Sequence, residues 1–348
     1  MTQSINAQTS NASSRFKVAV LGGGSFGTAI ANLIAESEHE VMLWLRDQTR
    51  ADEINHAHVN RRYLPDLILN TGVKASVSLE AAVTDADFVF IAVPSSSFRS
   101  VTEKLASVIS DRAYVVSLTK GVEKQSFALM SQIIGEVLPK HLVGVISGPN
   151  LAKELVEKQI TATVIASQSD TLISAVQQLL HTHYFRVYGN NDVFGVELGG
   201  ALKNCYAIMC GMANALGSGQ NTIGLLMTRS LAEMGRFAQE LGANPMTFLG
   251  LAGVGDLIVT CMSPLSRNFQ VGFAIGEGKP LDVICQELGQ VAEGVNTLKL
   301  VKQEADKRNI YMPLIQGMYR IIYDNEPLEI VVSELMGGDH RQDVEFHL

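Results

Sequence analysis

The sequence is poor in cysteine. Its 348 residues include only four, at positions 205, 210, 261 and 285, and no two of them form a C-x-x-C pair. Without such a pair or a histidine at zinc-ligand spacing, we expect reduced thiols in the cytoplasm and no metal. His181 and His183 could bind metal from one strand, but they lack supporting ligands and are interpreted as a solvated pair.

Positive charge and long apolar runs are also scarce. The chain has 27 basic and 35 acidic side chains, a formal net charge of −8, which argues against nucleic acid or an anionic membrane surface as the main partner. No apolar run approaches the ~20 residues of a membrane span, so we expect no membrane insertion. Residues 1–14 are polar without a signal-peptide pattern and are interpreted as a disordered tail.

Apolar residues, by contrast, make up 47% of the chain, and their arrangement changes along it. Up to about residue 190, apolar runs typical of buried parallel strands alternate with helical segments. The runs are FKVAVL (16–21), EVMLWL (40–45), DFVFIAV (87–93), AYVVSL (113–118), LVGVIS (142–147), TATVIAS (161–167) and YFRVYG (184–189). From Asp192 onward the pattern is almost entirely helical. We therefore predict an α/β fold, with an N-terminal Rossmann-type doubly wound, mostly parallel sheet (15–190) and a C-terminal all-α domain (191–348).

A glycine-rich turn follows the first predicted strand directly, with the spacing G-x-G-x-x-G. In this setting Gly22 permits the tight turn, Gly24 lets a pyrophosphate approach the backbone, and Gly27 lets the next helix pack on the sheet. The helix N-terminus then faces the anion. The pattern predicts a dinucleotide cofactor.

The end of the second predicted strand bears on which dinucleotide is bound. Arg46 occupies the position where an NAD site usually has an acid, and it can accept a 2′-phosphate. Asp47, the next residue, could still serve the ribose of NAD. We expect NADPH, with NADH as the open alternative.

One lysine stands in an otherwise apolar helical run, LGGALKNCYAIMCGMANAL (198–216). Burying an ammonium without a partner costs several kcal/mol or shifts its pKa until it loses the proton. Lys203 therefore either reaches water while its stem packs in the core, or serves in chemistry.

Other polar residues are expected near the same edge of the sheet. Lys120 and the segment Gly148-Pro149-Asn150 follow predicted strands, at the edge where the glycine turn lies. The glycine-rich loop 250–268 adds the carboxylate of Asp256 and the cluster Ser266-Arg267-Asn268. Arginine has a planar fork suited to phosphate oxygens, whereas the serine could equally be a helix N-cap.

Taken together, these residues resemble those of the bacterial NAD(P)-dependent glycerol-3-phosphate dehydrogenases. The similarity extends from Lys17 to about residue 335. It rests on GGGSFGTA, NRRYLPD, SLTKGVE, ISGPNLAKEL, VELGGALKN, GLAGVGDLIVTC with SRN, and GQVAEGVNT. Other dehydrogenases share the sheet and a helical second domain, but not this set of motifs in this order.

The resemblance implies NAD(P)H-dependent reduction of dihydroxyacetone phosphate to sn-glycerol 3-phosphate, which supplies phospholipid synthesis, with Lys203 as the catalytic acid/base. The implied substrate-binding residues are Lys120, Gly148, Asn150, Lys203, Asn204, Asp256, Thr260, Ser266, Arg267 and Asn268. With the three fingerprint glycines, the cofactor site would comprise Ser25, Phe26, Arg46, Lys120, Ala152, Arg267, Val291 and Glu293. Asn150 departs from the threonine or serine of many relatives, and another hydrogen-bonding side chain should be tolerated there.

Two other functions remain open at this point. The chain could be another two-domain dehydrogenase, acting on a hydroxy acid, a 3-hydroxyacyl thioester or a sugar acid. It could also be a protein that senses nicotinamide cofactors without catalysis. If the resemblance holds, the apolar helical domain is also expected to offer a face for a homodimer.

Overall fold

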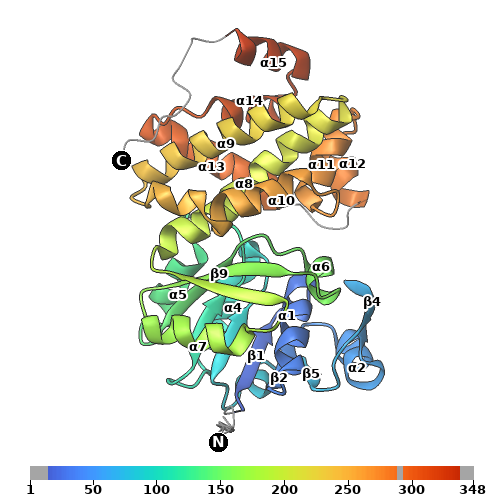
Figure 1. Ribbon diagram of the computed structural model, residues 1–348, viewed down its shortest axis with the longest axis vertical. Coiled ribbons are helices and arrows are strands. Elements are labelled where there is room, and N and C mark those ends of the chain that lie inside the picture. Colours follow the sequence, from blue (N-terminus) through green and yellow to red (C-terminus); the bar gives the residue numbers. More distant parts are fainter. Residues whose placement is uncertain (1–14, 288–292, 338–348) are drawn as a thin grey trace, which may run out of the picture.

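The computed structural model describes residues 15–287 and 293–337. Figure 1 shows a sheet with flanking helices at one end of the molecule and a group of helices at the other. The predicted tail (1–14) and Val291 lie outside the described residues. Within them, no helix is both long enough and apolar enough to cross a membrane.

The N-terminal half is built on one eight-stranded sheet. Its strand order is β10-β9-β8-β7-β6-β1-β2-β5, and every neighbouring pair is parallel except β8 with β9. The strands are β1 (Lys17–Leu21), β2 (Glu40–Trp44), β5 (Val73–Ser76), β6 (Phe88–Ile91), β7 (Tyr114–Ser117), β8 (Val143–Ser147), β9 (Thr161–Ser167) and β10 (Phe185–Asn190). The order from β5 through β1 to β8 is that of a Rossmann sheet.

All seven predicted strands are confirmed, and three strands were missed. β5 is a four-residue edge strand with alternating exposure, and β3 (Val59–Asn60) pairs with β4 (Leu64–Ile68) in a separate hairpin. These strands lack the continuous apolar run that identified the others, because they are not buried on both faces.

Helices cover both faces of the sheet, as the doubly wound fold requires. One apolar cluster lies beneath α1 and α7, and another beneath α4 and α5. The helices of this half are α1 (Ser25–Glu36), α2 (Gln48–Ala57), α3 (Leu79–Val83), α4 (Ser95–Leu105), α5 (Met130–Val137), α6 (Ala152–Val156) and α7 (Asp170–Leu180).

After β10 the described chain contains helices and no strand, which confirms the predicted all-α region. They are α8 (Val193–Ala215), α9 (Gln220–Glu240), η1 (Pro245–Leu249), η2 (Leu251–Gly255), α10 (Asp256–Met262), α11 (Arg267–Gly276), α12 (Leu281–Glu287), α13 (Glu293–Arg308), α14 (Pro313–Tyr323) and α15 (Leu328–Met336). The long helix α8 lies among the others and starts beside the sheet (Figure 1).

Glycines let α8 and α11 pack backbone against backbone. A Cβ added at Gly272 would lie 1.8 Å from the Ile208 carbonyl oxygen, and one at Gly211 would lie 2.1 Å from that of Phe269. Real side chains cannot fit at such distances. The close packing holds the first turn of α11 beside the middle of α8.

Two glutamates from the helical half, Glu197 and Glu293, tie it to the sheet half. Glu197 of α8 accepts hydrogen bonds from the backbone N–H (3.1 Å) and hydroxyl (2.5 Å) of Ser131 in the first turn of α5. Glu293 accepts one from the Ser95 N–H at the start of α4 (3.0 Å). Neither helix has an N-capping side chain of its own, so these carboxylates satisfy N–H groups that would otherwise lack partners.

Candidate active site

The glycine turn has the geometry that a dinucleotide phosphate needs. Gly22 has φ +128°, and an added Cβ there would lie 2.3 Å from the Ala92 carbonyl oxygen. A Cβ at Gly27 would lie 2.1 Å from the Gly22 oxygen, whereas one at Gly24 would meet open space. No side chain caps the N-terminus of α1. The backbone N–H groups there can donate hydrogen bonds to a pyrophosphate, so the loop fits the predicted cofactor.

The β3–β4 hairpin braces this turn. Asn60, only 1% exposed, donates from Nδ2 to the Gly23 carbonyl (3.1 Å) and to Thr28 Oγ1 (2.9 Å). The Ser25 hydroxyl donates to the Tyr63 carbonyl at 3.3 Å. The motif NRRYLPD, which contributed to the family resemblance, therefore supports the phosphate loop.

A cluster of two lysines around one aspartate forms the chemical centre. Lys203 donates from Nζ to Asp256 Oδ1 and to Thr260 Oγ1, the latter at 2.5 Å. Lys120 donates to the other carboxylate oxygen, Oδ2, at 2.5 Å, and to the Gly148 carbonyl at 2.9 Å. Residues more than 130 positions apart in the sequence thus meet at the carboxyl edge of the sheet.

Burial changes the acidity of Lys203, which is only 6% exposed. Loss of solvent lowers its pKa to about 8; the positive charge of Lys120 acts in the same direction, and the Asp256 carboxylate opposes both. The directions are those expected for a buried ammonium near one charge of each sign. At neutral pH the side chain is mostly protonated, yet it can release its proton at little cost.

Two adjacent glycines bring α8 close enough for this contact. A Cβ added at Gly200 would lie 2.5 Å from Ser147 Oγ at the end of β8. One at Gly199 would lie 2.8 Å from the Ala252 carbonyl oxygen. The glycine pair of VELGGALKN therefore lets α8 pack against the rim of the sheet, which places Lys203 beside Lys120.

The first turn of α11 lies next to this cluster. Asn268 donates from Nδ2 to Asn204 Oδ1 at 2.9 Å and accepts from the Gly294 N–H at 3.0 Å. The Ser266 hydroxyl accepts from the Phe269 N–H at 3.3 Å and caps α11, which confirms the capping interpretation. Arg267 is exposed, and its positive charge counteracts the burial that raises the pKa of Glu293.

Not every predicted residue joins the cluster. Asn150 is engaged with β9: it donates to the Ala162 carbonyl (3.2 Å) and accepts from the Thr163 hydroxyl (2.7 Å). Phe26 and Ala152 are partly buried against an apolar core of the sheet half. Arg46 is exposed just after β2, in the region where the glycine turn lies.

Sequence reasoning overlooked three residues that shape the site. Glu197 seats α8 on the sheet half, Asn60 braces the glycine turn, and Arg50 engages Asp47 after β2. Glu197 gave the same signal as Lys203, a charge within an apolar helix. Asn60 gave no signal, because its role depends on a contact between separate elements. Arg50 stands three residues after Asp47, and this local spacing was overlooked.

Comparison with known proteins agrees with this geometry. Two family models, for the NAD-dependent glycerol-3-phosphate dehydrogenase N-terminus and C-terminus, match residues 17–173 and 192–333. The glycerol-3-phosphate dehydrogenase [NAD(P)+] of Ectopseudomonas mendocina is 54% identical over 329 residues, which cover 94% of this chain and 96% of the relative. The corresponding protein of Acinetobacter baylyi is 54% identical over 332 residues, 95% of this chain and 93% of the relative.

A solved structure is similar over nearly the same length. The crystal structure of glycerol-3-phosphate dehydrogenase from Coxiella burnetii has a TM-score of 0.88 and 36% sequence identity, and the match covers 92% of this chain and 99% of that one. The two family models together cover the sheet from β1 to β9 and the helical half from residue 192 to residue 333. The chain belongs to the NAD-dependent glycerol-3-phosphate dehydrogenase family.

Proposed function

We propose that this protein uses NAD(P)H to reduce dihydroxyacetone phosphate to sn-glycerol 3-phosphate, which then supplies the glycerol backbone of phospholipids. The observation that carries the proposal is the buried ammonium of Lys203, held by Asp256 and Thr260 and close to Lys120, in a member of this dehydrogenase family. A buried cation at this edge of the sheet is suited to a reaction that creates negative charge.

Lys203 is the proposed general acid. When bound, the nicotinamide supplies a hydride to the C2 carbonyl of the substrate. The carbonyl oxygen then gains negative charge, which the Lys203 ammonium stabilises before it donates its proton. Asp256 and Thr260 hold the amine in place during the transfer. In the reverse direction the neutral amine accepts the proton from the C2 hydroxyl.

Lys120 has two proposed roles. Its charge lowers the pKa of Lys203, which keeps proton release near neutral pH accessible. Because its ammonium is fixed by Asp256 and the Gly148 carbonyl, it also contributes positive potential at the floor of the site. Both the substrate and the cofactor are anionic, so this potential favours their binding.

The first turn of α11 is the proposed phosphate anchor. Arg267 presents a guanidinium, and Ser266, Asn268 and Asn204 present hydroxyl and amide groups suited to phosphate or hydroxyl oxygens. The helix N-terminus adds partial positive charge. Thr260, Gly148 and Asn150 would complete the substrate-binding surface.

For the cofactor, we assign the pyrophosphate to the glycine turn with Ser25 and Phe26. Arg46 would lie near the adenosine ribose, while Ala152, Lys120, Arg267, Val291 and Glu293 would line the nicotinamide side. The Glu293 carboxylate, which bonds the Ser95 N–H, fits a position between the two halves of the molecule.

Comparing two ketones tests the proposed reaction. Consumption of NADPH should be rapid with dihydroxyacetone phosphate and slow with unphosphorylated dihydroxyacetone, since only the phosphate can use the anchor around Arg267. Comparable turnover of both would favour a dehydrogenase for unphosphorylated substrates. No turnover of either, with cofactor still bound, would favour a sensor.

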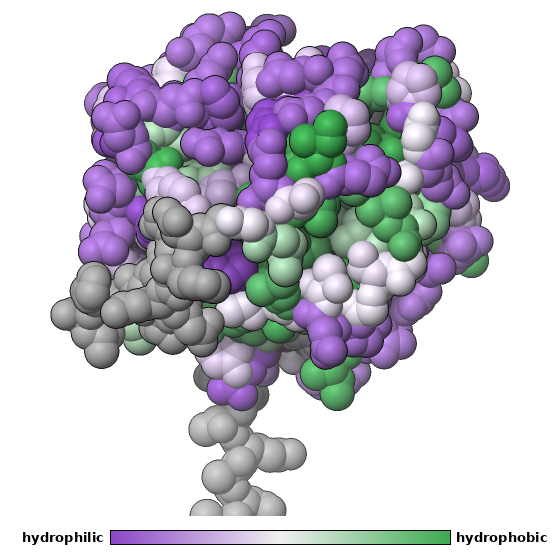
Figure 2. Space-filling model, turned by 90° about the horizontal axis from the view of Figure 1, so that it is seen from above, coloured by the Kyte–Doolittle hydropathy of each residue, from purple (hydrophilic) through white to green (hydrophobic). Residues whose placement is uncertain are grey.

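We also propose that the protein is a homodimer, formed through the end of the helical half that carries α15. Apolar side chains gather there among polar ones in Figure 2, and Ile330, Val332 and Met336 are 48%, 47% and 72% exposed. A groove of about 1000 Å³ runs along α8, α9, α14 and α15. Sedimentation of the purified protein at several concentrations would test this.

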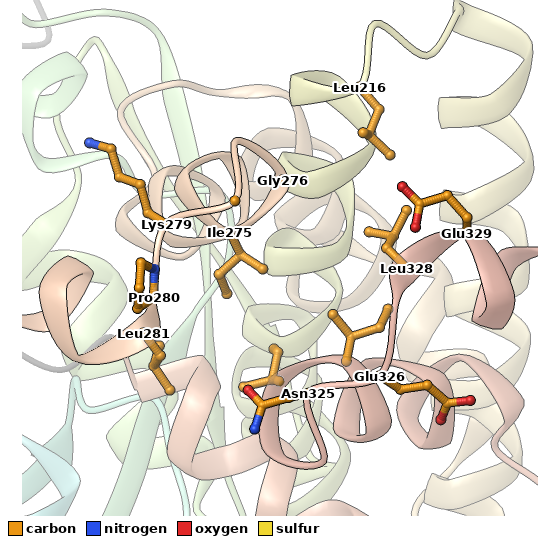
Figure 3. Close-up of a pocket in the computed structure, with 13 residues that line it drawn as sticks. Leu216, Ile275, Gly276, Lys279, Pro280, Leu281, Asn325, Glu326, Leu328 and Glu329 are labelled. Carbon is orange, nitrogen blue, oxygen red and sulfur yellow. The ribbon is translucent and has the colours of Figure 1, made fainter.

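A second cavity, of about 440 Å³, lies at the same end (Figure 3). Leu216, Ile275, Leu281 and Leu328 line it, and they come from or adjoin four different helices. Neither cavity is lined by a residue predicted to bind substrate or cofactor. This end of the molecule is therefore available for contacts between subunits.

The division into domains and the compartment also remain proposals. Separate apolar cores in the sheet half and in the helical half support domains at 15–190 and 191–348, which limited proteolysis would test. Four cysteines present as free thiols, three of them buried, suit the reducing cytoplasm. Fractionation of cells that express the protein would test the location.

A further inference from the structure

Asp47 is the acid that a site for NAD would use, and in this chain it is already occupied. Its Oδ1 accepts a hydrogen bond from the Arg50 backbone N–H at 3.2 Å, as the N-cap of α2. Its Oδ2 accepts from Arg50 Nε at 2.9 Å. The same two contacts hold the pKa of Asp47 below its usual value. Both carboxylate oxygens are therefore engaged by a single arginine.

Arg50 is itself held in place beside the cofactor loop. Its side chain is only 19% exposed, and its guanidinium carbon lies 5.3 Å from the centre of the Tyr63 ring. The Tyr63 carbonyl in turn accepts the hydroxyl of Ser25, the first residue of α1. The guanidinium is thus fixed between the end of β2 and the glycine turn, where the adenosine ribose of a Rossmann cofactor lies.

The donors of Arg50 are only partly used. In the described part of the chain, the hydrogen bonds of its side chain go to Asp47 through Nε, and its two Nη groups have no such partner. An arginine that is held through Nε can donate hydrogen bonds from its Nη groups to the oxygens of a phosphate. Two more arginines add positive charge nearby: Arg62, whose guanidinium carbon lies 5.6 Å from the centre of the Tyr63 ring, and Arg46.

We propose that Arg50 determines the preference for a cofactor with a 2′-phosphate, both by occupying Asp47 and by binding the phosphate. With the carboxylate occupied, the ribose hydroxyls of NADH lose their usual acceptor. With the Nη groups available, the phosphate of NADPH gains a charged partner. This inference rests on the proposed function, because it assumes that the glycine turn binds a nicotinamide dinucleotide.

Fragment binding tests the inference without any turnover. Calorimetric titration with 2′,5′-ADP and with 5′-AMP compares the same nucleoside with and without the 2′-phosphate. The unmodified enzyme should bind 2′,5′-ADP at least tenfold more tightly. Arg50→Gln should weaken 2′,5′-ADP about tenfold or more, the value of a lost charged hydrogen bond. It should leave 5′-AMP binding unchanged or tighter, because Asp47 is released.

A second variant should act in the opposite direction. Asp47→Asn keeps an N-cap residue of equal quality, so α2 should remain intact. It frees Arg50 from its ion pair and removes the negative charge, so 2′,5′-ADP should bind several-fold more tightly while 5′-AMP does not. Arg61→Gln is the matched control: it lies in the β3–β4 hairpin two residues from Tyr63, removes the same charge, and pairs only with Glu53 in the described structure. In Arg61→Gln the ratio of the affinities for 2′,5′-ADP and 5′-AMP should stay within twofold of that of the unmodified enzyme.

Two results would overturn the inference. One is an unchanged ratio of the two affinities in Arg50→Gln; the other is an equal loss for both fragments with a lowered melting temperature, which would mean that Arg50 only stabilises α2. If the unmodified enzyme binds neither fragment, the cofactor site itself is wrongly assigned. If it binds both equally yet reduces dihydroxyacetone phosphate, only the inference about Arg50 fails. The ratio of kcat/KM with NADPH and NADH should follow the fragment ratio.

Discussion

Two aspartates of this protein each hold cationic side chains, and they differ mainly in burial. The Asp256 side chain is 2% exposed and binds two lysines, whereas the Asp47 side chain is 39% exposed and binds one arginine. Charge interactions are strong and weakly screened by salt where water is excluded, and weak at the surface. The buried cluster can therefore alter proton affinity for chemistry, while the surface cluster is suited to recognising an anion.

The two clusters also form in different ways. Asp47 and Arg50 are three residues apart at the start of one helix, so their contact is local. The buried cluster joins Lys120, Lys203 and Asp256, which come from the sheet edge, α8 and α10. It exists only when the two halves of the molecule are correctly packed. Disturbing that packing should thus affect the chemistry more than cofactor recognition.

The largest expected effect comes from removing the buried ammonium. Lys203→Ala should lower kcat for reduction of dihydroxyacetone phosphate by ~10²–10⁴-fold, the usual contribution of a general acid. NADPH binding, followed by fluorescence titration, should be almost unchanged. Lys302→Ala, which removes a surface lysine paired with Asp306, is the control and should keep full activity. Rates of Lys203→Ala within a few-fold of the unmodified enzyme would contradict the assignment.

The next largest effect is a loss of stability, expected when the carboxylate between the two lysines is removed. Asp256→Asn leaves two ammonium groups without their shared counter-charge, and breaking a buried ion pair in this way typically costs about 3–5 kcal/mol. Urea denaturation would measure the change in the free energy of unfolding. In the matched surface pair, Asp306→Asn should cost only about 0.3–0.5 kcal/mol. Equal losses for both variants would mean that burial does not strengthen the ion pairs of Asp256 relative to a surface pair.

The close packing of α8 against the edge of the sheet can be tested by replacing each of two glycines with alanine. Gly200→Ala places a methyl group 2.5 Å from Ser147 Oγ and should push α8 away from the rim. Since a displacement of about 1 Å at a catalytic group can cost ~10²-fold in rate, kcat should fall by up to that factor. Binding of 2′,5′-ADP should remain intact.

Gly224→Ala in α9 provides the contrast. An added Cβ there meets nothing within 4 Å, so the change should leave kcat unaltered and raise stability. Alanine is favoured over glycine inside a helix by about 0.8–1 kcal/mol. If Gly200→Ala behaved like Gly224→Ala in both activity and melting temperature, the close approach of α8 would not matter for catalysis.

The last prediction concerns pH and needs no substitution. Burial lowers the pKa of Lys203 to about 8, and reduction requires the protonated amine. The rate of reduction should therefore fall as pH rises through about 8, whereas oxidation of glycerol 3-phosphate, which needs the neutral amine, should rise over the same range. Well above this pH the rate of reduction should fall about tenfold per pH unit, and well below it the rate of oxidation should fall about tenfold per pH unit. Profiles with the same slope sign in both directions would contradict a single group acting as acid and base.

Much of the fold could be predicted because its signals are local. Seven strands are apolar runs buried on both faces, and the glycine fingerprint lies in one continuous segment. The missed strands β3, β4 and β5 lie outside the buried core, so their sequences carry little apolar pattern. The capping role of Ser266 was visible for the same reason, because an N-cap acts within one turn.

The sequence by itself determined the Rossmann sheet, the helical second half, the phosphate loop and the presence of an unusual lysine, since periodicity and turn chemistry act over a few residues. Only the tertiary structure decided that Asp256 bridges Lys203 and Lys120, that Asn60 braces the glycine turn, and that the Arg50 guanidinium lies beside the Tyr63 ring. These contacts depend on where separate elements pack and which way their side chains turn. A pKa near 8 for Lys203 likewise follows from exclusion of water, which no single segment can specify.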